Sequence, residues 1–461
     1  MKPPFPSALS AVFRLLAFLL LSFALTARPA LAQSVLRDAE TEALFKDMSR
    51  PLIIAAGLEP GNVQIILLGD KDINAFVAGG QAVYINSGLI DAADNANEVQ
   101  GVIAHEIGHI TGGHIVRFGE GMKAATGITL LSLLLGAAAM AAGAGDAAMA
   151  AMMAGQQAAM GKFLAFTRAQ EGSADAAGAS FLRKAGISGR GIISFFGKLR
   201  SQEYRLSSSY ADIDPYAQTH PLTADRIQTL QADLQASPAW DKPTDPALEA
   251  RFQRIKGKLT GFMNDPEQTL RKYPESNQSV PARYARAYAW HKRAYPDKAQ
   301  AEVEKLLATQ PHDPYFLELK GQILLESGKP REALAPLREA VSRSQNQPLI
   351  ASLLGHALIA TEDSANFAEA RQVLKVAVAR DNDNPFAWYQ LGLVYDREGD
   401  KPRAALATAE RYNLEGRARL ALASAEQALH GIPQGTADYL RAQDIAMVSR
   451  TAIEDEKRKK K

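Results

Sequence analysis

The residues best suited to chemistry lie between Ala104 and His114, in the stretch AHEIGHITGGH. His105, Glu106 and His109 form the pattern H-E-x-x-H, and the apolar residues before it favour a helix. Residues four apart share one face of a helix, so the two imidazoles can bind one zinc ion. Glu106 would then reach a zinc-bound water and take its proton, giving a hydroxide that can attack a peptide carbonyl. The pattern therefore predicts a metal-dependent peptidase.

Two histidines leave a zinc site short of a third protein ligand. His114 does not fit the longer pattern H-E-x-x-H-x-x-G-x-x-H, because Ile115 stands where that pattern needs histidine. The better candidate is Glu171 in TRAQEGSADAAG, with Asp175 one helical turn later on the same face. We expect Glu171 to bind the metal. Asp175 could accept the free N–H of a zinc histidine and fix its tautomer.

Several segments together carry a family resemblance. HEIGH, EGSAD and THPLTADRI, with Asn74-Ala75-Phe76 upstream, resemble the HtpX-like and CAAX-prenyl-protease-like family of gluzincin zinc metallopeptidases. The similarity covers about residues 70–230 and implies one zinc ion per chain. The site residues that it implies are the ligands His105, His109 and Glu171, the base Glu106, and Asp175 in a catalytic or orienting role.

The segment that begins Thr219-His220-Pro221 offers a further group, because the resemblance brings it near the metal. A neutral His220 could occupy the fourth zinc position and hold the enzyme latent, as a reversible latch. Alternatively, His220 or Arg226 could stabilise the oxyanion of a tetrahedral intermediate. A third interpretation is a histidine at a helix start without any role at the metal. We favour the latch, since the serine-rich loop before His220 could let it move.

The elements that must hold these groups follow from the apolar pattern. Residues 62–88 predict three short strands and a tight turn at Gly79-Gly80, and hence a small antiparallel sheet. The last strand, AVYIN (Ala82–Asn86), is either an exposed edge that binds extended substrate or simple sheet core. Asn95 to Val116 is the expected metal-binding helix.

Residues 124–145 are almost uncharged and consist mostly of Ala, Leu, Gly and Met. By length this stretch could span a bilayer, although its many Ala and Gly residues argue otherwise. We predict a soluble helical hairpin or a lid over the cleft. Contact with a membrane surface and a true span, as in an integral-membrane protease, are the alternatives.

An internal repeat begins at about residue 281. The segment from Trp388 to Tyr395 closely matches the tetratricopeptide pattern W-x2-L-G-x2-Y. Repeats of this kind stack into a solenoid with a concave binding face. Equivalent small residues recur at intervals of 34, 34 and 37 residues, at Ala287, Gly321, Gly355 and Gly392.

The predicted fold is mainly α. An α+β zincin-type metalloprotease domain with a small antiparallel sheet precedes an α-helical tetratricopeptide solenoid. Lys2 and Arg14 before an apolar core, followed by Ala30-Leu31-Ala32, predict a signal peptide cleaved after Ala32; an uncleaved anchor is the alternative. The predicted boundaries are a signal peptide at 1–32, a protease domain at 33–260, repeats at 261–450 and a basic tail at 451–461.

Composition narrows the function. The net charge of +2 gives no indication of nucleic acid as a partner, and the absence of cysteine excludes disulfides and a lipid-anchored cysteine. We predict a periplasmic zinc endopeptidase. The resemblance implies that it degrades misassembled outer-membrane proteins and assists their assembly, with the repeats binding the assembly machinery. The alternative is a chaperone or scaffold with a mainly structural zinc site, against which Glu106 argues, because such a site needs no base.

Overall fold

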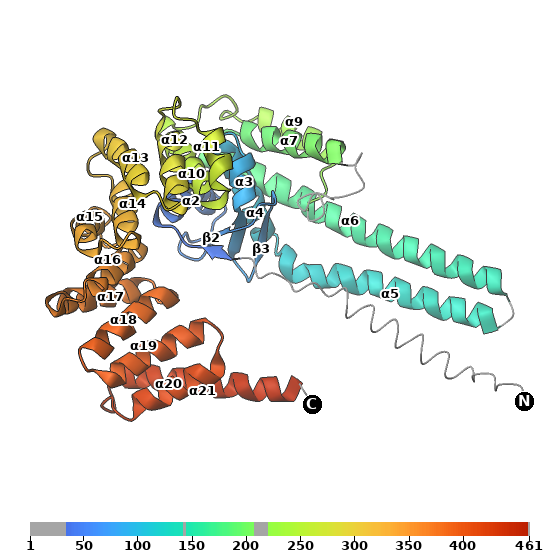
Figure 1. Cartoon of the computed structure of the whole chain (residues 1–461). Coiled ribbons are helices and arrows are strands. Elements are labelled where there is room, and N and C mark those ends of the chain that lie inside the picture. Colours follow the sequence, from blue (N-terminus) through green and yellow to red (C-terminus); the bar gives the residue numbers. More distant parts are fainter. Residues whose placement is uncertain (1–33, 142–143, 207–219, 460–461) are drawn as a thin grey trace, which may run out of the picture.

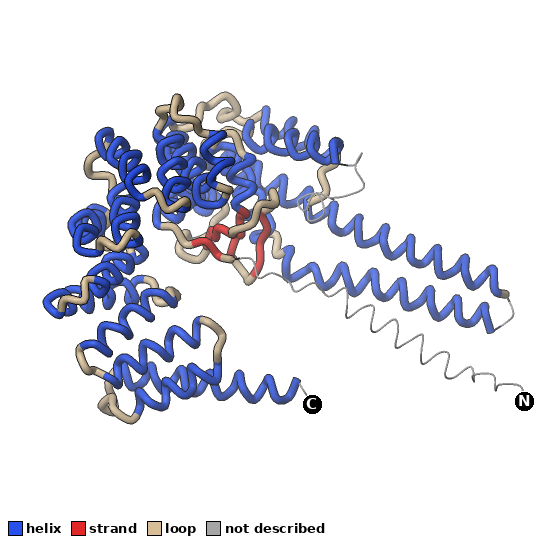
Figure 2. The backbone as a smooth tube through the Cα atoms, in the orientation of Figure 1, coloured by secondary structure: helices blue, strands red, loops and turns tan. Residues whose placement is uncertain are grey.

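The computed structural model describes residues 34–141, 144–206 and 220–459 (Figure 1). The signal peptide predicted at residues 1–32 lies outside this part of the chain. The described residues are mainly helical, with one small sheet near the N-terminus, and helix pairs fill the C-terminal half (Figure 2). This arrangement confirms the predicted fold class.

The sheet has four short strands in the order β1-β2-β4-β3. β3 and β4 form an antiparallel hairpin through Gly79 and Gly80, both at positive φ, where glycine is favoured. β2 and β4 pair in parallel, so the sheet is mixed rather than purely antiparallel. The strands are β1 (Val35–Leu36), β2 (Gln64–Leu68), β3 (Ala75–Ala78) and β4 (Ala82–Asn86).

The interpretation of AVYIN as an edge strand is wrong. After β2 the chain passes beyond the position of β4, forms β3 at the far side, and returns as β4 between its two neighbours. AVYIN is therefore paired on both sides. Among the described strands, β3 is the edge on the side of the sheet away from β1 and β2.

The helix that carries H-E-x-x-H is the centre of the protease core. Every residue of α4 from Ala96 to His109 is buried, and the helix packs against β3, α6 and α7. Its first turn is capped by Asn95, whose side chain accepts the Glu98 N–H at 3.0 Å. The helices around the sheet are α2 (Ala39–Ala55), α3 (Ser87–Ala92), α4 (Ala96–Thr111), α5 (His114–Ala141), α6 (Gly145–Ala185), α7 (Arg190–Leu206), α9 (Ala224–Gln235) and α10 (Pro246–Met263).

Residues 124–141 lie in α5, which forms a helical hairpin with α6, and Gly145 begins α6. The two helices run side by side and project away from the sheet, so they do not cover the site as a lid would (Figure 1). From His114 to Met140, α5 is long and apolar enough to cross a membrane. α6 is a single helix of 41 residues that continues from the hairpin into the protease core.

The C-terminal half is a stack of helix pairs. The small residues of the repeat lie where two helices approach closely: a Cβ at Gly321 would come within 2.4 Å of Leu337, and one at Gly355 within 2.5 Å of Leu374. The interval of 37 residues contains the short 3-10 helix η1 (Ser364–Asn366). The other helices are α11 (Pro266–Lys272), α12 (Val280–Lys292), α13 (Pro296–Thr309), α14 (Pro314–Glu326), α15 (Pro330–Arg343), α16 (Pro348–Ala360), α17 (Phe367–Arg380), α18 (Pro385–Arg397), α19 (Lys401–Leu414), α20 (Ala418–Leu429) and α21 (Ala437–Lys459).

Buried charges join the protease core to the first repeats. Glu40 of α2 accepts hydrogen bonds from Arg254 and Lys258 of α10 and, at 2.8 Å, from the Tyr284 hydroxyl of α12. Arg254 also donates two hydrogen bonds to Asp313, at 2.7 and 2.9 Å. The predicted domain boundary near residue 260 falls inside α10, the helix that carries both cations.

Replacing Glu40 with Gln should destabilise the whole chain by about 2 kcal/mol, because two buried cations lose a charged partner. The midpoint of urea unfolding measures this loss. The matched control is Asp47→Asn, which breaks an exposed ion pair to Arg251 between the same two helices. It should cost less than about 1 kcal/mol. Equal losses in the two variants would contradict this account.

Candidate metal centre

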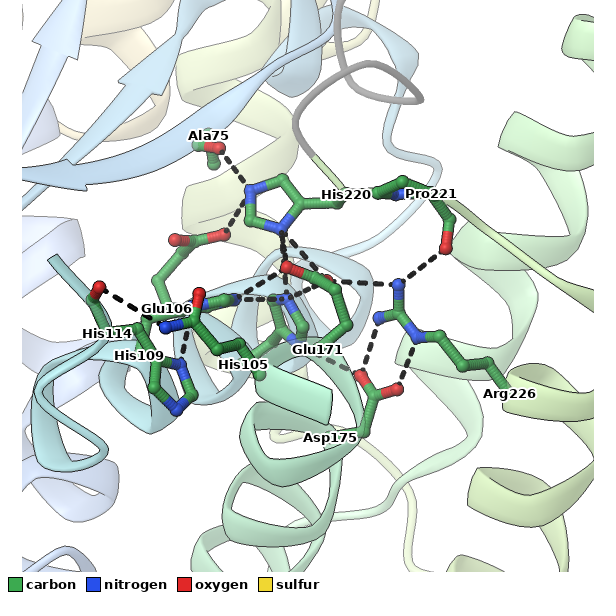
Figure 3. A network of polar contacts seen from close by, with 11 residues as sticks. Ala75, His105, Glu106, His109, His114, Glu171, Asp175, His220, Pro221 and Arg226 are labelled. Carbon is green, nitrogen blue, oxygen red and sulfur yellow. Dashed lines mark hydrogen bonds and ion pairs between the residues drawn. The ribbon is translucent and has the colours of Figure 1, made fainter. Parts of the chain in front are cut away.

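Four elements bring the expected functional side chains to one place (Figure 3). α4 and α6 cross at Gly108, where a Cβ would lie 2.5 Å from the carbonyl oxygen of Ala174. The chain before α9 and the first turn of α9 approach from the other side. The structure brings together all seven residues that the sequence indicated: His105, Glu106 and His109 from α4, Glu171 and Asp175 from α6, His220 before α9, and Arg226 within it.

Four donor atoms from these residues surround one point. His105 Nε2 lies 3.1 Å from His109 Nε2 and 3.3 Å from His220 Nδ1. The Glu171 carboxylate lies 3.1 Å from His220 Nδ1, 3.4 Å from His109 Nε2 and 3.5 Å from His105 Nε2. Donors bound tetrahedrally to zinc at 2.0–2.1 Å would be about 3.3 Å apart. Three imidazoles and a carboxylate at these separations fit a divalent metal of this kind.

The pKa values of His109 and Glu171 suit metal binding, whereas His105 must release a proton when a metal binds. Burial, followed by the neighbouring His105, lowers the pKa of His109 to about 2, so this ring is neutral and its lone pair is available. Burial would also lower the pKa of His105, but its contacts with Asp175 and Glu171 raise it to about 10. Burial would raise the pKa of Glu171, yet His220 and His105 hold it well below its usual range. The carboxylate is therefore charged, as a metal ligand must be.

A second layer of contacts orients His105. Its Nδ1 lies 2.9 Å from Asp175 Oδ1, which directs Nε2 towards the other donors. Asp175 is held in turn by Arg226, which donates from Nε at 2.6 Å and from Nη2 at 2.8 Å. Such a bidentate pair fixes the carboxylate in one orientation.

The contact that His114 makes with His109 was not predicted from the sequence. His114 is not one of the four clustered donors, in agreement with its rejection as a ligand, but its Nδ1 lies 2.9 Å from His109 Nδ1. Gly113 has φ of 61°, and this turn lets α5 begin at His114 directly beside α4. The signal for this contact was the Gly112-Gly113 pair after the motif, which marks a reversal of the chain.

Glu106 adjoins the cluster without belonging to it. It is fully buried, and neither carboxylate oxygen has a hydrogen-bond partner among the described residues. The Nε2 atom of His220 lies 3.6 Å from Glu106 Oε1. Burial raises the pKa of Glu106. A buried carboxylate without a hydrogen-bond partner is rare in a structural position and is common where a proton is transferred.

The fold and the site together define a metallopeptidase of the H-E-x-x-H type. Residues 36–234 match the model of Peptidase family M48, and all four clustered donors lie within this segment.

Relatives extend the similarity beyond that domain. The chain is 26% identical over 385 residues to the beta-barrel assembly-enhancing protease of Yersinia pestis, covering 81% of this chain and 76% of that protein. It is 27% identical over 386 residues to the protein of the same name from Escherichia coli K12, with the same coverage. Among solved structures, it is similar to YrrB, a TPR protein with an unusual peptide-binding site, at 20% identity and a TM-score of 0.31, covering 39% of this chain and 92% of that chain.

Replacing Glu171 with Gln should weaken zinc binding more than about 100-fold. Even a residue that only orients a ligand typically contributes 10- to 100-fold, and here the charged ligand itself becomes neutral. Titration of the metal-free chain with zinc against a competing chelator measures the affinity. Glu120→Gln is the control, since Glu120 is exposed on α5. Undiminished affinity in Glu171→Gln would mean that the third ligand is another residue.

Proposed function

We propose that this chain is a periplasmic zinc endopeptidase that degrades misassembled outer-membrane proteins and assists their assembly. The observation that carries the enzymatic part is the buried carboxylate of Glu106, which has no hydrogen-bond partner among the described residues and lies beside four metal-suited donors. The similarity to two proteases named for enhancing β-barrel assembly supports the substrate class. That similarity covers most of the chain, which supports a role for the repeats in binding the assembly machinery.

Zinc held by His105, His109 and Glu171 would supply a water of lowered pKa and polarise the scissile carbonyl. Glu106 takes the proton of the attacking water and later donates it to the leaving nitrogen. Its raised pKa suits the first step, because a stronger base accepts the proton more readily. Asp175 acts through His105, whose orientation it fixes at 2.9 Å.

His220 is proposed as a latch. Its Nδ1 is one of the four clustered donors, and a catalytic site needs that fourth position open for water and substrate. The contacts of Arg226 argue against an oxyanion role for Arg226 itself. Its guanidinium donates to both oxygens of Asp175 and lies 3.0 Å from Glu171, so it already neutralises two carboxylates. Activation then requires His220 to leave the cluster.

A chaperone or scaffold with a structural zinc site remains the second candidate. The closed set of four protein donors favours it, because structural zinc sites are usually four-coordinate and complete. The two functions differ in what they need from Glu106, which a structural site does not use.

The variant Glu106→Gln should therefore retain its zinc and its fold. It should hydrolyse an unfolded protein substrate at least about 100-fold more slowly. The rate of cleavage, measured beside zinc content, tests this expectation. Glu120→Gln again serves as the control and should cleave at the original rate. Full activity in Glu106→Gln would refute the assignment of the base. A chain with no protease activity that still prevents aggregation of clients would favour the chaperone.

His220→Ala should raise proteolysis several-fold if His220 is a latch, because the fourth position is then always open. It should suppress proteolysis if His220 is an oxyanion donor. Initial rates on a protein substrate at saturating zinc separate the two. His312→Ala, which removes an exposed histidine from the repeats, is the control. An unchanged rate with zinc retained would eliminate both roles.

A further inference from the structure

In the hairpin of α5 and α6, small residues lie between the helices and many large apolar residues face outward, the opposite of a helix pair in water. Small residues line the seam: a Cβ at Gly155 would come within 1.9 Å of Ser132, and one at Gly136 within 2.7 Å of Met152. Helices in water turn their large apolar side chains towards each other. Here many of the large apolar side chains are exposed on both helices. The exposed ones include Leu131, Leu134, Leu135, Met149, Met153 and Met160.

This inversion is the packing that lipid favours. In a bilayer, helices associate through small residues that let the backbones approach, and large apolar residues face the acyl chains. Only 11% of the most apolar part of α5 is buried, so it is not the core helix of a soluble domain. It also begins at His114, far from the N-terminal stretch that resembles a signal peptide.

The apolar part of the hairpin is nearly as long as the hydrocarbon layer of a bilayer is thick. Residues 124–140 of α5 contain no ionisable side chain and extend about 25 Å, against about 30 Å for the hydrocarbon of a bilayer. Residues 147–161 of α6 contain none either, although Gln156 and Gln157 contribute polar amides. Asp146 stands alone at the tip.

Two of the three hydroxyl groups in residues 124–140 of α5 are satisfied by their own helix. Thr129 donates to the carbonyl oxygen of Ala125 at 3.1 Å, and Ser132 donates to that of Thr129 at 2.8 Å. These side chains therefore need no water, which is the condition for placing a hydroxyl in lipid.

Cations mark the base of the hairpin. Residues 117–123 and 162–168 lie at the same level, because a Cβ at Gly121 would come within 2.4 Å of the Phe166 ring. These two segments hold four cationic side chains and one carboxylate. The cations are Arg117, Lys123, Lys162 and Arg168, the carboxylate is Glu120, and all five residues are exposed. A net positive belt at this level complements anionic lipid headgroups.

We propose that the α5–α6 hairpin inserts tip-first into a lipid bilayer that contains anionic headgroups, with the cations at its base among those headgroups. α6 then links the bilayer rigidly to the metal centre. Glu171 lies nine residues beyond Lys162 on the same helix, or about 14 Å along its axis. The metal centre is therefore held close to the membrane surface. This inference stands independently of the proposed catalytic function.

Co-sedimentation with vesicles tests the proposal. The chain from Gln33 onward is used, so that the apolar N-terminal stretch cannot bind lipid itself. It should bind vesicles of phosphatidylcholine and phosphatidylglycerol more tightly than vesicles of phosphatidylcholine alone. Lys123→Gln with Lys162→Gln should weaken binding to the anionic vesicles about 30-fold, at about 1 kcal/mol per cation.

The apolar contribution is tested with Leu131→Gln combined with Leu134→Gln, at positions that are 58% and 61% exposed. This variant should bind lipid at least about 100-fold more weakly and keep its circular dichroism and zinc content. The matched control is Leu440→Gln with Met447→Gln on α21, at positions 54% and 61% exposed, which should bind as the original chain does.

Two results would overturn the proposal. The first is unchanged vesicle binding by the Leu131→Gln, Leu134→Gln chain. The second comes from light scattering without lipid. A dimer that this variant converts to a monomer would assign the exposed leucines to a second copy of the chain instead of to a bilayer.

Discussion

The site depends on the close crossing of α4 and α6 at Gly108. The missing side chain lets the Ala174 backbone approach, and this approach brings the Glu171 carboxylate to the two histidines of α4. The separations between the Glu171 carboxylate and the two histidines of α4 follow from this one contact. The other elements support it: Asn95 caps α4, and the edge strand β3 offers the Ala75 carbonyl oxygen, 3.3 Å from His220 Nε2.

Arg226 connects two features of the site that otherwise come from different segments. Its guanidinium holds Asp175, which orients His105, and it also donates to the Pro221 carbonyl oxygen at 2.9 Å. Pro221 follows His220 directly. Arg226 therefore influences both the orientation of His105 and the position of His220, the proposed latch. Under the proposed latch, movement of His220 would change the surroundings of the carboxylate behind His105, so that release and ligand geometry would be coupled.

The parts of the site on α4 and α6 could be predicted because their spacings are helical, whereas only the family resemblance indicated His220 and Arg226. Two histidines four apart must share a face, and the same rule relates Glu171 to Asp175. It could not predict how the strands pair, because alternation of apolar residues marks a strand but carries no information about its neighbours. The parallel pairing of β2 with β4, and the interior position of AVYIN, result from the route of the chain. The contact of His114 with His109 was missed because only its distance along the motif was considered.

The edge position of β3 has a consequence for selectivity. A chain that adds to this edge must offer backbone N–H and C=O groups that are not already paired. A correctly closed β-barrel has none to offer, since each of its strands is bonded on both sides. An incomplete barrel exposes them at its open seam. For the substrates proposed here, a protease with such an edge would distinguish finished from unfinished barrels by their free backbone groups. It would not need to recognise any particular side chain.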